Sequence, residues 1–212
     1  MIYQTDIPAD FQDRFSSIFC RFLQGVEANI SLIPPLAEAY DRLFYGRLVR
    51  SELRLADLRK NASLLHVGSG PRPMTAMKLA AAGHEIVGLE MDEKARRKSR
   101  TIIEREGYGD RIEIISGDGR EIEIDDFEAI WLSLHVKGKE SLIRRYIQGS
   151  QTDLKIIYRN PAGFLTGFYD QLPPEIFAEE NNMKEDNLKK GPVIMGKQSC
   201  LLNIEANAEV SQ

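Results

Sequence analysis

The spacing of hydrophobic residues divides the chain into two regions. Apolar residues recur at three- and four-residue steps over 9–30 and again over 36–58, which predicts two amphipathic helices. From Ser63 onward, short apolar runs alternate with helical patterns, which is typical of strand–helix–strand units and a mostly parallel sheet. We therefore expect an α/β fold with three parts: a helical N-terminal segment (1–60), a Rossmann-like domain (61–206) and a short disordered tail (207–212).

The Rossmann-like part contains five strand patterns and three helix patterns. They are Leu64–Val67, Glu85–Leu89, Ile112–Ile115, Ala129–Leu134 and Leu154–Tyr158 for strands, and Met74–Ala82, Glu93–Glu106 and Lys139–Gln148 for helices. Asp92 is a natural cap for the second helix, because its carboxylate can accept a backbone N–H. Val193–Met195 and Ser199–Ile204 predict a hairpin that adds an antiparallel edge to the sheet. Such a sheet is typical of the methyltransferase fold that binds S-adenosylmethionine (SAM).

Composition narrows the functional classes. With 42% hydrophobic residues, 28% charged residues and a net charge of −4, the chain is typical of a globular protein. No apolar run approaches the roughly 20 residues that cross a bilayer, and the N-terminus lacks a secretory pattern. We therefore expect a soluble, cytoplasmic protein that binds no membrane. The basic run 94–100 has the spacing of a solvated helix surface, so no nucleic acid partner is expected. A homodimer is compatible with this composition.

The first predicted strand is followed at once by a glycine turn, Gly68-Ser69-Gly70. Glycine allows a tight reversal and lets a ligand approach the backbone. A dinucleotide fingerprint needs a third glycine where this chain has Pro73, so NAD and FAD are disfavoured. SAM has no phosphate and needs only the tight turn. Taken alone, the turn is as readily structural as functional.

Two carboxylates after later strands favour a SAM site. Glu90 ends the second strand, where a carboxylate can accept both ribose hydroxyls. Asp118 lies in the turn after the third strand, where it can hold the adenine amino group. Each alone is often a helix cap or a solvated carboxylate, but the ordered set with the glycine turn predicts SAM as co-substrate. The residues predicted to contact SAM are Val67, Gly68, Ser69, Gly70, Thr75, Glu90, Met91, Gly117, Asp118, Gly119 and Leu134.

The segment Val67–Thr75 resembles the Gly-Ser-Gly-Pro-Leu-Pro-Leu-Thr turn of the nicotianamine synthases and related metallophore synthases. Arg72 and Met74 replace two of the leucines. Three other stretches carry the resemblance: Tyr45, Leu48 and Glu52 in a helix, Ile156–Arg159 with Gly163 and Tyr169, and the closing strands from Gly196 to Leu202.

The resemblance implies transfer of the 3-amino-3-carboxypropyl group of SAM to an amine of a small amino-acid-like acceptor, leaving methylthioadenosine. An amine is protonated near neutral pH, so a general base is needed. Glu52 is the candidate, with Tyr45 on the same helix face orienting the substrate. Arg159 is expected just past a strand end, where it can clamp a carboxylate through two hydrogen bonds. His135 is expected to line the acceptor pocket.

The same residues also have simpler structural interpretations. Glu52 lies among Arg47, Arg50 and Arg54, which also favours a surface salt bridge, and Arg159 is equally compatible with a loop charge. Four further residues are expected to be structural: His66 as a satisfied core histidine, Trp131 as core, and Cys20 and Cys200 as buried, reduced thiols. The three histidines share no metal spacing, so no metal is expected.

The chain is short and lacks an obvious long lid, so we expect one transfer rather than several. The second hypothesis is a small-molecule methyltransferase on the same fold, because a fold does not determine which carbon is transferred. A third is a SAM-binding or purely structural protein without turnover.

Overall fold

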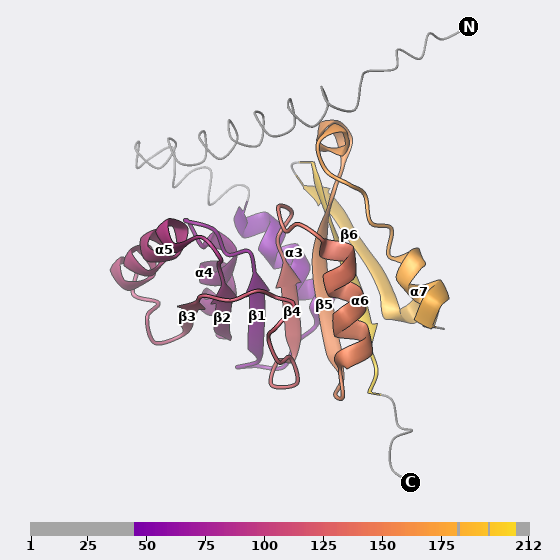
Figure 1. Ribbon diagram of the computed structural model, residues 1–212, viewed down its shortest axis with the longest axis horizontal. Helices are drawn as coiled ribbons and strands as arrows, with labels where there is room; N and C mark the ends of the chain where they lie inside the picture. The colour runs from indigo at the N-terminus through magenta and orange to yellow at the C-terminus, as the bar shows by residue number, and fades with distance from the viewer. Residues whose placement is uncertain (1–44, 182, 195, 207–212) are drawn as a thin grey trace, which may run out of the picture.

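A twisted seven-stranded sheet forms the centre of the computed structural model, which describes residues 45–206 except 182 and 195 (Figure 1). The strand order is β3-β2-β1-β4-β5-β7-β6. Every described pair of neighbours is parallel except those that β7 makes with β5 and β6. The strands are β1 (Ser63–Val67), β2 (Glu85–Leu89), β3 (Ile112–Ile115), β4 (Ala129–Leu132), β5 (Leu154–Pro161), β6 (Leu188–Ile194) and β7 (Lys197–Ile204).

Helices cover both faces of this sheet, because its strands alternate apolar side chains between two cores (Figure 1). One core joins residues such as Leu64 and Trp131 to α3 (Gly46–Ala56), α4 (Met74–Ala81) and α5 (Glu93–Arg105). The other joins residues such as Leu65 and Tyr158 to α6 (Lys139–Gly149) and α7 (Glu175–Asn181). Two short 3-10 helices complete the described elements, η2 (Gly163–Gly167) and η3 (Glu185–Asn187).

The expected α/β fold is confirmed, including the antiparallel strand near the C-terminus. The predicted bounds of β2 and β3 match the structure. The Asp92 cap is also confirmed, because its Oδ1 accepts the Ala95 backbone N–H at 2.7 Å. Trp131 and Cys200 are buried, and Cys200 is a free thiol. The predicted helix over 9–30, the start of the one over 36–58, Cys20 and the tail over 207–212 lie outside the described residues.

The structure differs from two predicted strand ends. β4 ends at Leu132 rather than Leu134, because the chain turns after Ser133, whose carbonyl accepts the Val136 N–H at 3.3 Å. β5 continues to Pro161, because β7 pairs with it along its whole length. The predicted hairpin does form the antiparallel edge of the sheet, with β7 next to β5 and β6 outermost.

The edge strand β6 begins five residues earlier than the hydrophobic pattern indicated, at Leu188 instead of Val193. Its first half contains lysines, and its register with β7 shifts between Lys190 and Val193. Polar residues and bulges are typical of sheet edges, where they oppose pairing with other chains. Helix α7 was not predicted at all. No helix within the described ranges is long and apolar enough to cross a membrane.

Candidate functional site

Residues from four sequence motifs meet at the carboxyl edge of the parallel strands. The glycine turn follows β1, Glu90 follows β2, Asp118 follows β3 and His135 follows β4. In open α/β sheets, ligands bind in the crevice outside this edge. The fold therefore brings together residues that the sequence separates by as many as 67 positions.

The glycine turn has a backbone that favours glycine. Gly68 and Gly70 adopt φ angles of +77° and +68°, which residues with a Cβ rarely adopt. The turn is held against β2, because the N–H groups of Gly68 and Ser69 both donate to the Leu89 carbonyl, at 3.0 and 3.1 Å. A Cβ at Gly68 would lie 2.8 Å from Val136 Cγ2, whereas one at Gly70 would meet no described heavy atom within 4 Å. The turn is thus packed at Gly68 and open at Gly70.

Glu90 joins this turn to the end of β2. Its Oε2 accepts the Gly70 N–H at 2.7 Å, and its Oε1 accepts the Asp92 N–H at 2.9 Å. Each carboxylate oxygen has a further lone pair with which it can accept a ligand hydroxyl. The next residue, Met91, exposes 71% of its surface, although it is large and apolar. Glu90 and Met91 therefore offer an acceptor group and an apolar surface side by side.

Asp118 lies in the turn after β3 and is paired with a neighbour. Its carboxylate accepts hydrogen bonds from Arg120 Nε at 3.0 and 2.9 Å, and from the Arg120 backbone N–H. The hydrogen bonds from Arg120 lower the pKa of Asp118 to about 2. A Cβ at either flanking glycine would crowd a side chain, because it would lie 2.9 Å from Leu89 Cδ2 at Gly117 and 2.7 Å from Tyr146 Oη at Gly119.

The side chain of Glu52 extends from α3 into a buried network of hydrogen bonds between the helix and the sheet. Its side chain is fully enclosed and that of Arg159 is 4% exposed. Arg159 Nε donates to Glu52 Oε1 at 2.7 Å and Arg159 Nη2 donates to Oε2 at 2.8 Å. Ser199 Oγ also donates to Oε1, at 2.7 Å, and Trp131 Nε1 to Oε2, at 3.1 Å. Burial alone would lower the pKa of Arg159, but the Glu52 carboxylate outweighs it and the pKa is raised.

This network corrects three interpretations of the sequence. Glu52 makes a buried ion pair, not a surface salt bridge with the arginines of its own helix. Arg159 is not a loop charge and does not follow a strand end, because it lies within β5. It does clamp a carboxylate through two hydrogen bonds, but that carboxylate belongs to Glu52. Arg159 Nη2 also donates to Thr75 Oγ1 at 3.1 Å, which turns Thr75 toward the network.

His66 lies in β1 next to this network and is buried. Its Nε2 is 3.0 Å from Ser133 Oγ, but its Nδ1 is buried with no hydrogen-bond partner among the described residues. The prediction of a fully satisfied core histidine is therefore wrong at Nδ1. Desolvation, followed by the charge of Arg159, lowers the pKa of His66 to about 3.

The low pKa of His66 predicts acid sensitivity. Between pH 6.5 and 3 the unfolded chain holds a proton on this ring that the folded chain does not, so stability is lost as the pH falls. From pH 7.5 to 5 we expect this residue to lower the free energy of unfolding by about 2 kcal/mol. Urea unfolding of the wild type and His66→Gln, whose side chain can still reach Ser133, should show a shallower loss in the variant. Equal losses in both proteins would contradict the assignment.

Lys139, which the sequence did not single out, contacts the backbone near the ends of β4 and β5. Lys139 is buried, and its Nζ donates to the carbonyls of Leu134, at 3.2 Å, and Arg159, at 2.8 Å. Burial, then the charge of Arg159, lowers the pKa of Lys139 to about 8. The sequence does not distinguish this lysine from a solvated lysine at the start of a helix. Its hydrogen-bond partners are backbone carbonyls, which every residue has, so no residue type marks them in the sequence.

Tyr45 and His135 lie near the same edge of the sheet as Lys139, the carboxyl edge of the parallel strands. Lys197 Nζ is 5.3 Å from the centre of the Tyr45 ring, so Tyr45 and Glu52 both reach β7 from α3. His135 is exposed, and its Nδ1 is 2.8 Å from Tyr169 Oη. Desolvation, followed by Lys197, Lys139 and Arg159, lowers the pKa of His135 to about 4.

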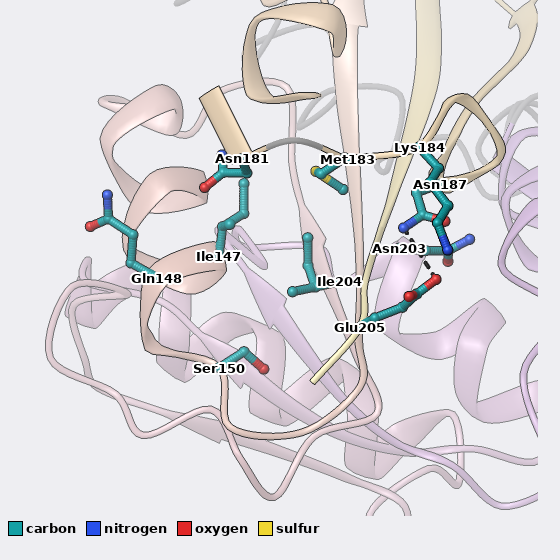
Figure 2. A pocket seen from close by; sticks show the side chains of 10 residues that line it. All are labelled: Ile147, Gln148, Ser150, Asn181, Met183, Lys184, Asn187, Asn203, Ile204 and Glu205. Atoms are coloured by element: carbon teal, nitrogen blue, oxygen red, sulfur yellow. Dashed lines mark hydrogen bonds between the residues drawn. The ribbon is translucent and has the colours of Figure 1, made fainter. Parts of the chain in front are cut away.

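A separate hollow of about 450 Å³ lies at the opposite edge of the sheet (Figure 2). It is lined by the end of α6, the end of β7 and four residues from the end of α7 to η3, namely Asn181, Met183, Lys184 and Asn187. Ile147 and Ile204 face one another across it. None of the predicted site residues lines it.

The strand order and the carboxyl-edge site define the class: a Rossmann-like fold of the SAM-dependent methyltransferase type. Among solved structures, a glutamate-to-glutamine mutant of MtNAS, a nicotianamine synthase, has a TM-score of 0.68 and 19% identity over 93% of this chain and 75% of that one. The same mutant in complex with S-adenosylmethionine has a TM-score of 0.66 and 20% identity over 93% of this chain and 77% of that one. The expected likeness to nicotianamine synthases is thus confirmed in the fold.

Methyltransferases are also similar. An RNA methyltransferase from Salinibacter ruber, in complex with S-adenosyl-L-homocysteine, has a TM-score of 0.58 and 18% identity over 78% of this chain and 95% of that one. A mitochondrial ribosomal RNA small subunit methyltransferase of Arabidopsis thaliana is 26% identical over 106 residues, or 50% of this chain. The matched part spans 28% of that relative's length. No protein-family model matches the sequence.

Proposed function

We propose that the chain is a SAM-dependent transferase that moves the 3-amino-3-carboxypropyl group of SAM to an amine of a small amino-acid-like acceptor, releasing methylthioadenosine. The observation that carries the proposal is the hydrogen bond between the Gly70 N–H and the Glu90 carboxylate, which joins the glycine turn to the end of β2. Gly70 itself stays open at the carboxyl edge of the sheet. SAM would lie across this turn with its ribose hydroxyls on Glu90 and its adenine against Met91. A structure of the same fold in complex with SAM, together with the rule that ligands bind at this edge of an open α/β sheet, supports a SAM site here.

The choice of transferred group rests on positioning. The sulfonium of SAM has three electrophilic carbons, and the one that faces the nucleophile reacts. The fold match to MtNAS extends over 93% of this chain, and the turn Val67–Thr75 resembles that family's own. These two observations favour transfer of the aminocarboxypropyl group.

In this proposal α3 shapes the acceptor side of the site. All four donors to Glu52 come from β4, β5 and β7, so the carboxylate fastens the helix over that half of the sheet. We assign Glu52 a positioning role, because a carboxylate that already accepts four hydrogen bonds is poorly placed to take a substrate proton. Tyr45, at the start of the same helix, remains the residue proposed to orient the acceptor.

Product analysis tests the function. The purified protein would be incubated with SAM alone and with ammonium chloride, glycine, L-histidine or L-2,4-diaminobutyrate, and small molecules would be identified by mass spectrometry. Methylthioadenosine with an acceptor enlarged by the aminocarboxypropyl group is the expected result. Absence of both methylthioadenosine and S-adenosylhomocysteine with every amine would contradict any transferase function toward these acceptors.

A methyltransferase is the second candidate. The similarity to the plant ribosomal RNA methyltransferase and to the Salinibacter ruber structure favours it. S-adenosylhomocysteine with a methylated acceptor in the same assay would decide for this candidate.

A further inference from the structure

His135 stands at the acceptor side of the proposed site. It lies in the loop after β4, and residues on both sides of it lie against the end of β1 and the first glycine of the turn. The Ser133 N–H donates to the Val67 carbonyl at 3.2 Å, and Val136 Cγ2 would lie 2.8 Å from a Cβ at Gly68. The imidazole is therefore held close to the turn across which SAM is proposed to lie.

Tyr169 fixes the orientation of this imidazole. The two rings pack edge to face, with centres 5.3 Å apart and planes at 68°, and Tyr169 Oη is 2.8 Å from His135 Nδ1. When Nδ1–H donates to the tyrosine oxygen, Nε2 carries the lone pair and is the nitrogen that can accept a proton. Among the described residues, no group is hydrogen-bonded to Nε2. The residue exposes part of its surface, so a substrate can reach it, although the groups packed around the ring still desolvate it.

The charges around His135 keep the ring neutral near pH 7, but by themselves they make it a weak base. Lys139 at the start of α6, Lys197 on β7 and Arg159 on β5 all disfavour a positive charge on the ring, and desolvation has the largest effect. Together they hold the pKa of His135 at about 4, so the ring is neutral near pH 7. A substrate carboxylate placed among these cations would raise that pKa and strengthen the base.

We propose that His135, oriented by Tyr169, accepts the proton that the acceptor amine loses during transfer. The nitrogen lone pair forms the new N–C bond to the carbon bound to sulfur. The C–S bond breaks and its electron pair neutralises the sulfonium, which leaves as the thioether. The proton passes from nitrogen to His135 Nε2. This inference rests on the proposed transferase function and gives that reaction the base that the enclosed Glu52 does not supply.

His135→Asn is the sharpest test, because the asparagine amide can keep the contact with Tyr169 but has no counterpart to Nε2. With the amine that reacts fastest with the wild type, we expect kcat to fall by roughly 10²- to 10⁴-fold. The affinity for SAM, measured by calorimetry, should change less than about twofold. Tyr169→Phe, which loses only the orienting hydroxyl, should lower kcat less than His135→Asn does. A variant His135→Asn with kcat within threefold of the wild type would overturn the proposal.

A second measurement does not depend on turnover. The chain has three histidines, so NMR of protein carrying ¹⁵N-labelled histidine gives few signals, and the one lost in His135→Asn belongs to His135. At pH 7 the proposal requires the neutral tautomer with the proton on Nδ1. A neutral ring with its proton on Nε2 would also overturn it. The two negative results are distinguishable. If the wild type forms no product, the proposed function is contradicted, and the base role with it. If His135→Asn retains turnover, only the base role is contradicted.

Discussion

Replacing Glu52 with alanine is expected to lower the free energy of unfolding by about 3–5 kcal/mol, the usual cost of removing one partner from a buried ion pair. The change leaves the Arg159 guanidinium without its counter-charge and leaves Ser199 Oγ and Trp131 Nε1 without their acceptor. Urea unfolding followed by fluorescence measures the loss. Trp131 is the single tryptophan of the chain, so the signal comes from within the network itself.

Two controls separate this effect from a general sensitivity to mutation. Arg97→Ala breaks a pair with Glu93 in which both side chains are largely exposed, so its cost should stay below about 1 kcal/mol. The double variant Glu52→Met with Arg159→Met removes both charges, and it should be more stable than Glu52→Ala. The double variant also provides a measurement if Glu52→Ala does not fold. A loss below 1 kcal/mol in Glu52→Ala would show that the buried pair does not hold α3 to the sheet.

Replacing Gly70 with leucine is expected to weaken SAM binding by roughly 100-fold or more, which corresponds to about 2.7 kcal/mol at 25 °C. At Gly70 a side chain would point into the open side of the turn, where the nucleoside is proposed to lie. The backbone φ of +68° also disfavours any residue with a Cβ. Isothermal titration calorimetry with SAM measures the change directly.

Gly107→Leu is the matched control. Gly107 has a φ of +77°, and a Cβ at this position would meet no described heavy atom within 4 Å. It therefore carries similar backbone strain, but it follows α5 rather than β1. Its substitution should lower stability without altering the affinity for SAM. Undiminished SAM affinity in Gly70→Leu would place the cofactor elsewhere.

The sequence by itself determined the fold class and the order of its elements. Alternating apolar runs and helical patterns located β1 to β5 and the helices between them, because local periodicity follows from which side of an element is buried. The same reasoning located the glycine turn, Glu90 and Asp118, because each follows directly from a strand end. It missed α7 and the first half of β6, where exposed and polar residues weaken the periodic signal.

The tertiary structure decided the partners of the charged residues. Glu52 and Arg159 are 107 positions apart. The helical period places Glu52 on the same face as Leu48 and Ala56, but it does not show which cation pairs with the carboxylate. Likewise, only the pairing of β7 with β5 shows that Arg159 lies within a strand. Hydrogen bonds and ion pairs between distant segments depend on the three-dimensional arrangement of the elements, whereas hydrophobic periodicity is a property of each element alone.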